Sequence, residues 1–124
     1  MKSYVHAMIA AALLSAAPVL AHPKVASATP AAGATVAAPA TIELHLTETL
    51  MPKLSGATLT MTGMPGMADH PPMPIKSTSR IGSDGKTLMV VPKSKLAAGS
   101  YRVDWHVVSS DTHRVTGTHD FTVQ

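Results

Sequence analysis

Hydrophobic and polar residues alternate in short runs along the chain. In residues 41–47 the apolar side chains of Ile42, Leu44 and Leu46 are interleaved with polar ones. A period of two places one set of side chains in the core and the other in solvent. Residues 101–107 repeat the pattern, and Trp105 on their apolar side is predicted to be the centre of the core. Both runs therefore predict β-strands with one buried face.

Seven such runs follow residue 21, with proline, glycine and aspartate between them. They span 24–28, 41–47, 57–62, 75–81, 87–91, 100–109 and 118–123. Residues 29–40 contain Pro30, Gly33 and Pro39, and are predicted to be a loop that passes between sheets. No segment has the period of a long helix. The pattern predicts one all-β domain, a sandwich or a barrel.

The first 21 residues have a different character. Lys2 precedes an apolar stretch at 5–14, and small or apolar residues lead to Ala21. This layout predicts a secretory signal peptide over residues 1–21, with a mature chain that begins at His22. An uncleaved membrane anchor is the alternative, but the apolar run is short and ends at Pro18. We therefore expect an exported protein that does not span the membrane.

The composition narrows the chemistry that the domain can perform. The chain has no cysteine, which excludes disulfides, thiolate metal sites and cysteine nucleophiles. It has 8 methionines and 7 histidines, whereas acidic residues number only 7. Its 10 basic residues are scattered, without the basic run or aromatic platform that nucleic-acid binding requires. Candidate sites are therefore those for transition metals.

Methionines are concentrated between two of the predicted strands. Residues 61–73 contain four of them and one histidine: Met61, Met64, Met67, His70 and Met73. The intervening glycines and prolines are incompatible with a helix, so we expect these side chains on a loop. Thioethers are soft, neutral ligands that favour Cu(I). An apolar partner-binding loop is the alternative, and the spacing leaves open which of the five residues bind at once.

A second set of candidate ligands joins the two ends of the mature chain. After cleavage, His22 offers both its α-amine and its ring nitrogen, while Pro23 has no backbone N–H that a metal could displace. Asp111 and His113 lie two residues apart and face the same way if extended. Nitrogen and oxygen donors of this kind suit Cu(II). The remaining mature histidines, His45, His106 and His119, are expected on the surface.

Three segments together resemble the CopC/PcoC family of periplasmic copper-resistance proteins. They are the His-Pro at 22–23, the Met-x-x-Met-Pro-Gly-Met run at 61–67, and the run from Trp105 to His113. The resemblance covers residues 22–124 and implies a seven-stranded Greek-key β-sandwich or barrel, cupredoxin-like or immunoglobulin-like, with copper sites at opposite ends. It implies these Cu(II) ligands: His22, Asp111 and His113. It implies these Cu(I) ligands: Met61, Met64, Met67, His70 and Met73.

The resemblance also suggests what surrounds the Cu(II) site. Glu48 matches an acidic position near that site and is expected beside the ligands rather than among them. Arg114 is a departure, since relatives often have proline there. The implied role is a periplasmic copper carrier without catalytic turnover or a small-molecule substrate. The implied partners are a CopD-like inner-membrane copper transporter or a CopA-like multicopper oxidase.

Two other classes of protein compete with the carrier. A histidine-brace copper oxygenase also begins with a mature histidine and uses a second one. Against it, aromatic residues are too few for a flat polysaccharide-binding face, and Asp111 would fill a coordination position that oxygen chemistry needs open. A metal-free immunoglobulin-like interaction module is the third possibility. A module of this kind would not explain the methionines at 61–73 or the histidine at position 22.

Overall fold

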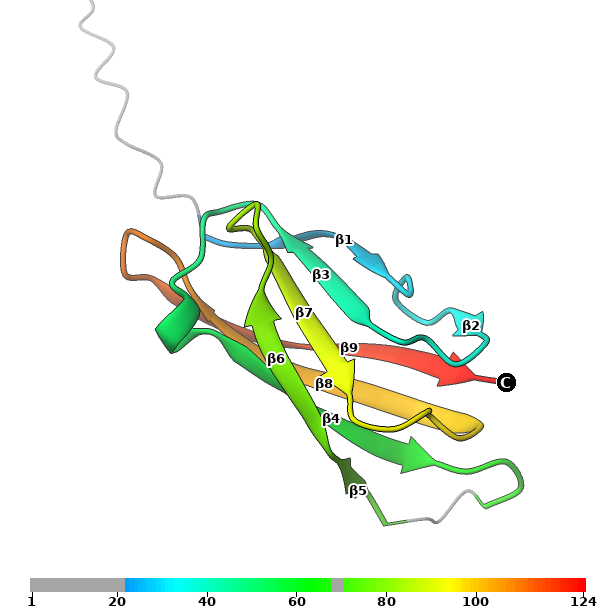
Figure 1. Cartoon of the computed structure of the whole chain (residues 1–124). Coiled ribbons are helices and arrows are strands. Elements are labelled where there is room, and N and C mark those ends of the chain that lie inside the picture. The colour runs from blue at the N-terminus through cyan, green and yellow to red at the C-terminus, as the bar shows by residue number, and fades with distance from the viewer. Residues whose placement is uncertain (1–21, 68–70) are drawn as a thin grey trace, which may run out of the picture.

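The protein is a sandwich of two β-sheets (Figure 1) in a computed structural model that describes residues 22–67 and 71–124. The predicted leader at 1–21 and the predicted ligand His70 lie outside the described residues. Within the described ranges, no helix has the length and apolar character needed to cross a membrane. The all-β prediction is confirmed.

The described residues form nine strands in two sheets. The first sheet has the order β1 (Val25–Thr29), β3 (Ile42–Leu46), β7 (Thr87–Pro92), β6 (Ser77–Ile81). The second has the order β2 (Thr35–Val36), β9 (Arg114–Val123), β8 (Gly99–Val108), β4 (Gly56–Gly63), β5 (Met73–Ile75). All pairings are antiparallel except β2 with β9. A 3-10 turn, η1 (Pro52–Leu54), precedes β4.

The structure corrects three of the predicted strand boundaries. The run 75–81 is two strands, because the chain crosses at Lys76 from β5 in the second sheet to β6 in the first. The last strand begins at Arg114 rather than at 118, since β9 pairs with β8 along its whole length. The predicted loop 29–40 contains the two-residue strand β2. Alternation of side chains does not reveal which sheet a strand joins.

The core is centred on an aromatic pair rather than on Trp105. Tyr101 of β8 stacks on Phe121 of β9 with ring centroids 5.5 Å apart, and both are almost fully buried. Trp105 also belongs to the core but retains 9% exposure. Its ring covers Gly117, where an added Cβ would lie 2.3 Å from Trp105 Cζ2. The inner face of the second sheet is therefore filled by aromatic side chains and has no room for a larger residue at 117.

One of the three histidines expected on the surface is buried. His119 is only 6% exposed, and its Nε2 lies 2.8 Å from the carbonyl oxygen of Pro30. The bond ties β9 to the end of β1 and satisfies a ring that the core would otherwise leave unpaired. His45 and His106 are half-buried on the outer faces of their sheets, as predicted.

Candidate metal centres

Three segments meet at the end of the sandwich nearest the start of the described chain. Figure 1 shows this start, in blue, beside the orange loop between β8 and β9. The backbone N–H of Thr47 donates to the carbonyl of Lys24 at 2.9 Å, and that of Ser110 donates to the carbonyl of Thr49 at 3.0 Å. Residues 47–49 therefore bind the N-terminal segment on one side and the 109–113 loop on the other.

This arrangement brings two predicted ligands from opposite ends of the chain into contact. The rings of His22 and His113 meet edge to face, with centroids 5.2 Å apart and an interplanar angle of 81°. Pro23 is buried, so the backbone beside His22 is anchored while its ring remains exposed. The two rings are therefore direct neighbours at this end of the sandwich.

Asp111 is held in place by its own loop. Its Oδ1 accepts hydrogen bonds from the hydroxyl of Ser109 and from the backbone N–H of His113, the latter at 3.3 Å. The hydrogen bond from Ser109, the nearby His113 ring and the backbone N–H of His113 lower the pKa of Asp111 from 3.8 to about 2. The carboxylate therefore stays charged over the whole physiological range. Ser109, which the sequence did not single out, fixes its orientation.

His113 has a ring nitrogen that suits a metal. Its Nδ1 lies 3.1 Å from Oδ2 of Asp111, but the geometry is not that of a hydrogen bond, and this buried atom has no directed partner. Imidazole and carboxylate donors of this kind fit Cu(II). In the described part of the chain, however, no three histidine, aspartate or glutamate side chains are already gathered as a metal cluster. His22 and the Asp111–His113 pair are neighbours that must turn inward to share an ion.

Glu48 and Arg114 lie at the edges of this cluster. Glu48 is half-buried in the bend that joins the N-terminal segment to the 109–113 loop. Its predicted position beside the Cu(II) ligands stays a prediction. Arg114 follows His113 directly, is exposed and begins β9. The carboxyl group of Glu48 and the guanidinium of Arg114 are thus close to this cluster along the chain.

Three of the predicted methionine ligands line one hollow at the other end of the sandwich. The hollow has a volume of about 400 Å³, and its lining includes Met61, Met64 and Met73. Met61 of β4 pairs directly with Met73 of β5 and with Tyr101 of β8. Residues paired in this way present their side chains on the same face of the sheet. The pairing of Met61 with Tyr101 therefore places the methionine hollow next to the aromatic pair of the core.

The prediction that all these methionines lie on a loop is wrong for two of them. Met61 belongs to β4 and is only 3% exposed, and Met73 belongs to β5. Pro74 does not prevent this pairing because β5 is an edge strand, where a missing N–H is tolerated. The glycines and prolines exclude a helix, as argued from the sequence, but they permit short strands on either side of the turn.

Met67 lies outside the lining of the hollow. It is 54% exposed, in a tight turn where its N–H donates to the carbonyl of Met64 at 3.0 Å. Gly66 supports this turn with a φ of +75°, which a residue with a Cβ rarely adopts. The structure therefore gathers three of the five predicted donors and places Met67 in the adjoining turn, while His70 lies outside the described residues. Three lysines that the sequence did not single out share the hollow: Lys76, Lys93 and Lys95.

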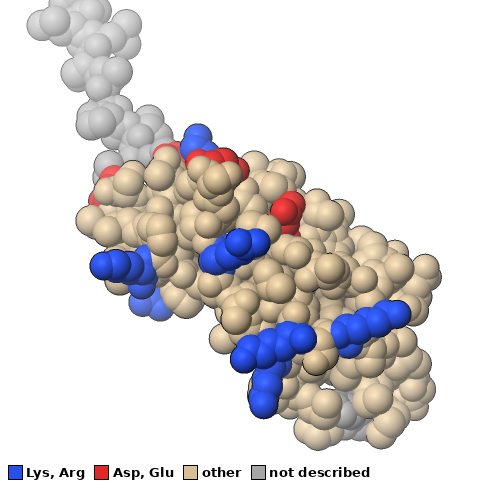
Figure 2. Space-filling model, viewed as in Figure 1, with Lys and Arg blue, Asp and Glu red and all other residues tan. Residues whose placement is uncertain are grey.

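The two groups of ligands are far apart. Strand β8 runs between them, from Tyr101 at the methionine hollow to Val108 beside the 109–113 loop. At about 3.3 Å per residue, the groups are separated by roughly 25 Å. Figure 2 shows carboxylates mainly toward the end nearest the N-terminus, and basic side chains spread over the visible face. The opposite placement of the two groups agrees with the expectation drawn from the sequence.

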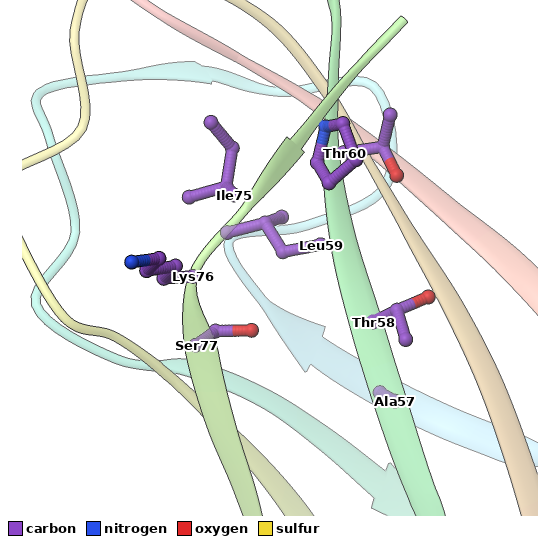
Figure 3. Close-up of a pocket in the computed structure, with 8 residues that line it drawn as sticks. Ala57, Thr58, Leu59, Thr60, Ile75, Lys76 and Ser77 are labelled. Atoms are coloured by element: carbon purple, nitrogen blue, oxygen red, sulfur yellow. The ribbon is translucent and has the colours of Figure 1, made fainter.

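A further hollow of about 410 Å³ lies where the chain leaves β5 for β6 beside β4 (Figure 3). Its lining consists of Ala57, Thr58, Leu59, Thr60, Pro74, Ile75, Lys76 and Ser77. These residues supply no thioether, imidazole or carboxylate. This hollow is therefore not a candidate metal site.

The structure is a small β-sandwich with possible metal ligands grouped at its two ends, and comparison with known proteins identifies the family. The CopC domain model matches residues 25–124, and the chain belongs to the CopC family. It is 51% identical over 117 residues to copper resistance protein C of Pseudomonas syringae pv. tomato, which covers 94% of this chain and 92% of that protein. It is 50% identical over 105 residues to copper resistance protein C of Escherichia coli, covering 85% and 83%.

Solved structures support the same assignment. The crystal structure of PcoC, a methionine-rich copper resistance protein from Escherichia coli, has a TM-score of 0.77 and 49% identity, with 84% of this chain and 100% of that chain covered. The crystal structure of CopC from Methylosinus trichosporium OB3b has a TM-score of 0.69 and 28% identity, covering 83% and 94%. The predicted family and fold class are confirmed.

Proposed function

We propose that this protein is a periplasmic copper carrier with separate sites for Cu(II) and Cu(I). The observation that carries the proposal is the contact between the rings of His22 and His113, beside the fixed carboxylate of Asp111. Relatives that share about half of its sequence are named copper resistance proteins. The carrier has no catalytic turnover, because its task is to bind copper and release it to another protein.

The proposed Cu(II) ligands are His22, Asp111 and His113. Cleavage after Ala21 frees the α-amine of His22, which then forms a chelate with its own imidazole. Pro23 prevents the ion from continuing along the backbone, since it has no N–H to lose. The two imidazoles and the charged carboxylate complete a set of nitrogen and oxygen donors that Cu(II) prefers. Glu48 lies nearby and is proposed to adjust the charge around the ion.

The proposed Cu(I) ligands come from the methionine hollow. Met61, Met64 and Met73 already line one space, and their thioethers need no deprotonation to bind. Met67, in the adjoining turn, and His70, three residues further along the chain, are proposed to complete the coordination when copper binds. A soft, neutral donor set of this kind holds Cu(I) and releases it on oxidation to Cu(II).

The separation of roughly 25 Å between the sites determines how copper is transferred. A change of oxidation state makes the thioether site a poor host and the histidine site a good one. An ion cannot bridge this distance within one molecule without entering solvent, so transfer takes place between molecules. The proposed receivers are an inner-membrane copper transporter or a multicopper oxidase. Lys76, Lys93 and Lys95 around the methionine hollow favour a receiver with acidic side chains at its docking face.

The rival reading as a histidine-brace oxygenase is disfavoured by the same geometry. A brace requires open coordination positions where oxygen reacts. Asp111 is charged and held beside His113 by Ser109, so its carboxylate is poised to occupy one of them. We therefore retain the carrier as the proposed function.

Simultaneous loading with both ions tests the proposal. The protein, without oxygen, is given one equivalent each of Cu(I) and Cu(II), and X-ray absorption reports the ligands of each ion. We expect sulfur ligands on Cu(I) only, with both ions bound. His113→Ala should release Cu(II) alone, whereas Met64→Leu with Met73→Leu should weaken Cu(I) alone. Competition of the two ions for one site would contradict the proposal.

A further inference from the structure

A hollow of about 210 Å³ lies on the outer face of the first sheet, between β3 and the hairpin that joins β6 to β7. Glu43 and His45 of β3 line it and are two residues apart, so they share one face. Met89 of β7 is the cross-strand partner of Glu43 and lines the same hollow. Its sulfur lies 3.7 Å from the position that a Cβ would take at Gly82. One imidazole, one thioether and the carboxylates of Glu43 and Asp84 therefore line a common space, and the proposed copper sites use none of them.

The hydrogen bonds around this hollow assign the proton on His45. Asp84 accepts hydrogen bonds from the backbone N–H groups of Lys86 and Thr87, each at 2.9 Å, and from the Thr87 hydroxyl at 2.7 Å. These bonds lower the pKa of Asp84, so its carboxylate is charged and can only accept. The single hydroxyl proton of Thr87 is therefore directed at Asp84.

The oxygen of Thr87 must then accept a hydrogen bond from His45, whose Nδ1 is 3.0 Å away. Neutral His45 consequently carries its proton on Nδ1 and a lone pair on Nε2. That Nε2 lies 3.5 Å from Oε2 of Glu43. Two acceptors that face one another at this distance repel unless a cation lies between them.

The geometry points to a third metal site, at which His45 and Glu43 bind a divalent ion of intermediate softness, Cu(II) or Zn(II), beside the thioether of Met89. A histidine that binds a metal through one ring nitrogen commonly donates its other N–H to an oxygen, which fixes the tautomer and the ring orientation. The chain Asp84–Thr87–His45 is such an arrangement. Imidazole, carboxylate and thioether together suit ions at the borderline between hard and soft.

The protein contains a matched pair that lacks this support. Asp104 and His106 on β8 have the same acid-x-histidine spacing and are also half-buried on an outer face. The carboxylate of Asp104, however, accepts from Nε of Arg102 at 3.1 Å. A guanidinium thus already neutralises this carboxylate. Asp104 and His106 therefore serve as an internal control for the spacing alone.

Titration of the whole mature protein with Zn(II), followed by histidine ring nitrogen NMR, tests the site. Without metal, His45 should show the tautomer protonated on Nδ1. Zn(II) should shift its Nε2 after the site of His22 and His113 is filled, with little change at His106. Glu43→Gln should weaken the response of His45 by about tenfold or more, whereas Asp104→Asn should leave it unchanged.

Two results would overturn the inference. One is a His45 ring that carries its proton on Nε2 in the absence of metal. The other is a His45 ring whose nitrogens do not respond at Zn(II) concentrations well above those that shift His22 and His113. The first result would mean that a proton, rather than a metal, lies between Glu43 and His45. Because Glu43 is on the surface of the sheet, Glu43→Gln should fold normally, which a far-ultraviolet circular dichroism spectrum checks.

Discussion

The ring of His22 lies edge-on against the ring of His113, with centroids 5.2 Å apart, although the two residues are far apart in the sequence. Backbone hydrogen bonds hold both ends to residues 47–49, so the contact follows from the fold rather than from flexible side chains alone. The proposed Cu(II) site therefore depends on three segments, and a change in any of them should disturb it.

Removal of the Ser109 hydroxyl should raise the pKa of Asp111. The hydrogen bond from Ser109 is the largest cause that lowers this pKa from 3.8 to about 2. A carboxyl group with a lowered pKa stabilises the fold above its unfolded pKa, and this contribution is lost as the pH falls through the folded value. Ser109→Ala should therefore destabilise the protein more at pH 5 than at pH 2. Carbon NMR of the Asp111 carboxyl gives the titration midpoint directly.

The exposed neighbour Ser110 provides the control for this change. Ser110→Ala should leave the midpoint of Asp111 where it is, because its side chain is not among the causes of the shift. An unchanged midpoint in Ser109→Ala would contradict the account of how Asp111 is held. It would also remove the reason to expect a fixed carboxylate at the Cu(II) site.

Substitution of methionines in the hollow should weaken Cu(I) binding without loss of stability. Leucine has nearly the same volume as methionine, so Met64→Leu and Met73→Leu preserve packing but remove a sulfur. Each should lower Cu(I) affinity by about tenfold or more, measured by competition with a coloured chelator. Met51→Leu, at a methionine outside the hollow, is the control and should bind Cu(I) normally. Wild-type affinity in both hollow variants would show that these sulfurs are not ligands.

A side chain at Gly117 should destabilise the fold. An added Cβ would lie 2.3 Å from Cζ2 of Trp105 and 2.7 Å from Cε2, and a buried indole has little room to move. We expect Gly117→Ala to cost about 1–3 kcal/mol in the free energy of unfolding, as overpacked cores do, measured by urea denaturation. Gly63→Ala is the control, since its Cβ would lie 3.9 Å from the nearest atoms of Ser100. Equal stability of the two variants would contradict the packing described here.

Copper transfer between the two kinds of site should depend on protein concentration. The sites are separated by roughly 25 Å along β8, so an ion oxidised at the methionine hollow must pass to another molecule. Protein loaded with Cu(I) and then exposed to air should gain the Cu(II) signal faster in proportion to its concentration. A mixture of a His113→Ala donor and a Met64→Leu, Met73→Leu acceptor isolates this step. A transfer rate independent of concentration would indicate a path within one molecule.

Much of the fold was predictable because alternation of side chains is a local property. The runs at 41–47 and 100–109 were identified from the sequence and became β3 and β8. The division of 75–81 between two sheets was missed, since a crossing at Lys76 changes the partner of the strand without interrupting its alternation. His119 was misplaced because it is polar, although alternation puts it on the same buried face as Phe121 and Val123. Its bond to Pro30, from a distant segment, satisfies the ring there.

The candidate ligands were predictable because their residue types are unusual. The residues that hold these ligands in position were not predictable. Met61 was identified as a ligand, but its burial in β4 depends on pairing with Tyr101. Ser109 is a common residue in an ordinary loop, and only the structure shows its hydroxyl bound to Asp111. Which neighbour holds a ligand side chain in position depends on the three-dimensional structure, so a sequence motif does not reveal it.

Electron paramagnetic resonance of the mature protein with one equivalent of Cu(II) tests the central claim most directly. The spectrum is compared with that of a variant that carries one extra residue before His22. Addition of this residue converts the α-amine of His22 to an amide and moves the free amine away from the ring. We predict a tetragonal, nitrogen-rich signal in the mature protein that is lost or strongly altered in the extended variant. An unchanged signal would contradict the N-terminal Cu(II) site and leave the methionine hollow as the only support for a copper carrier.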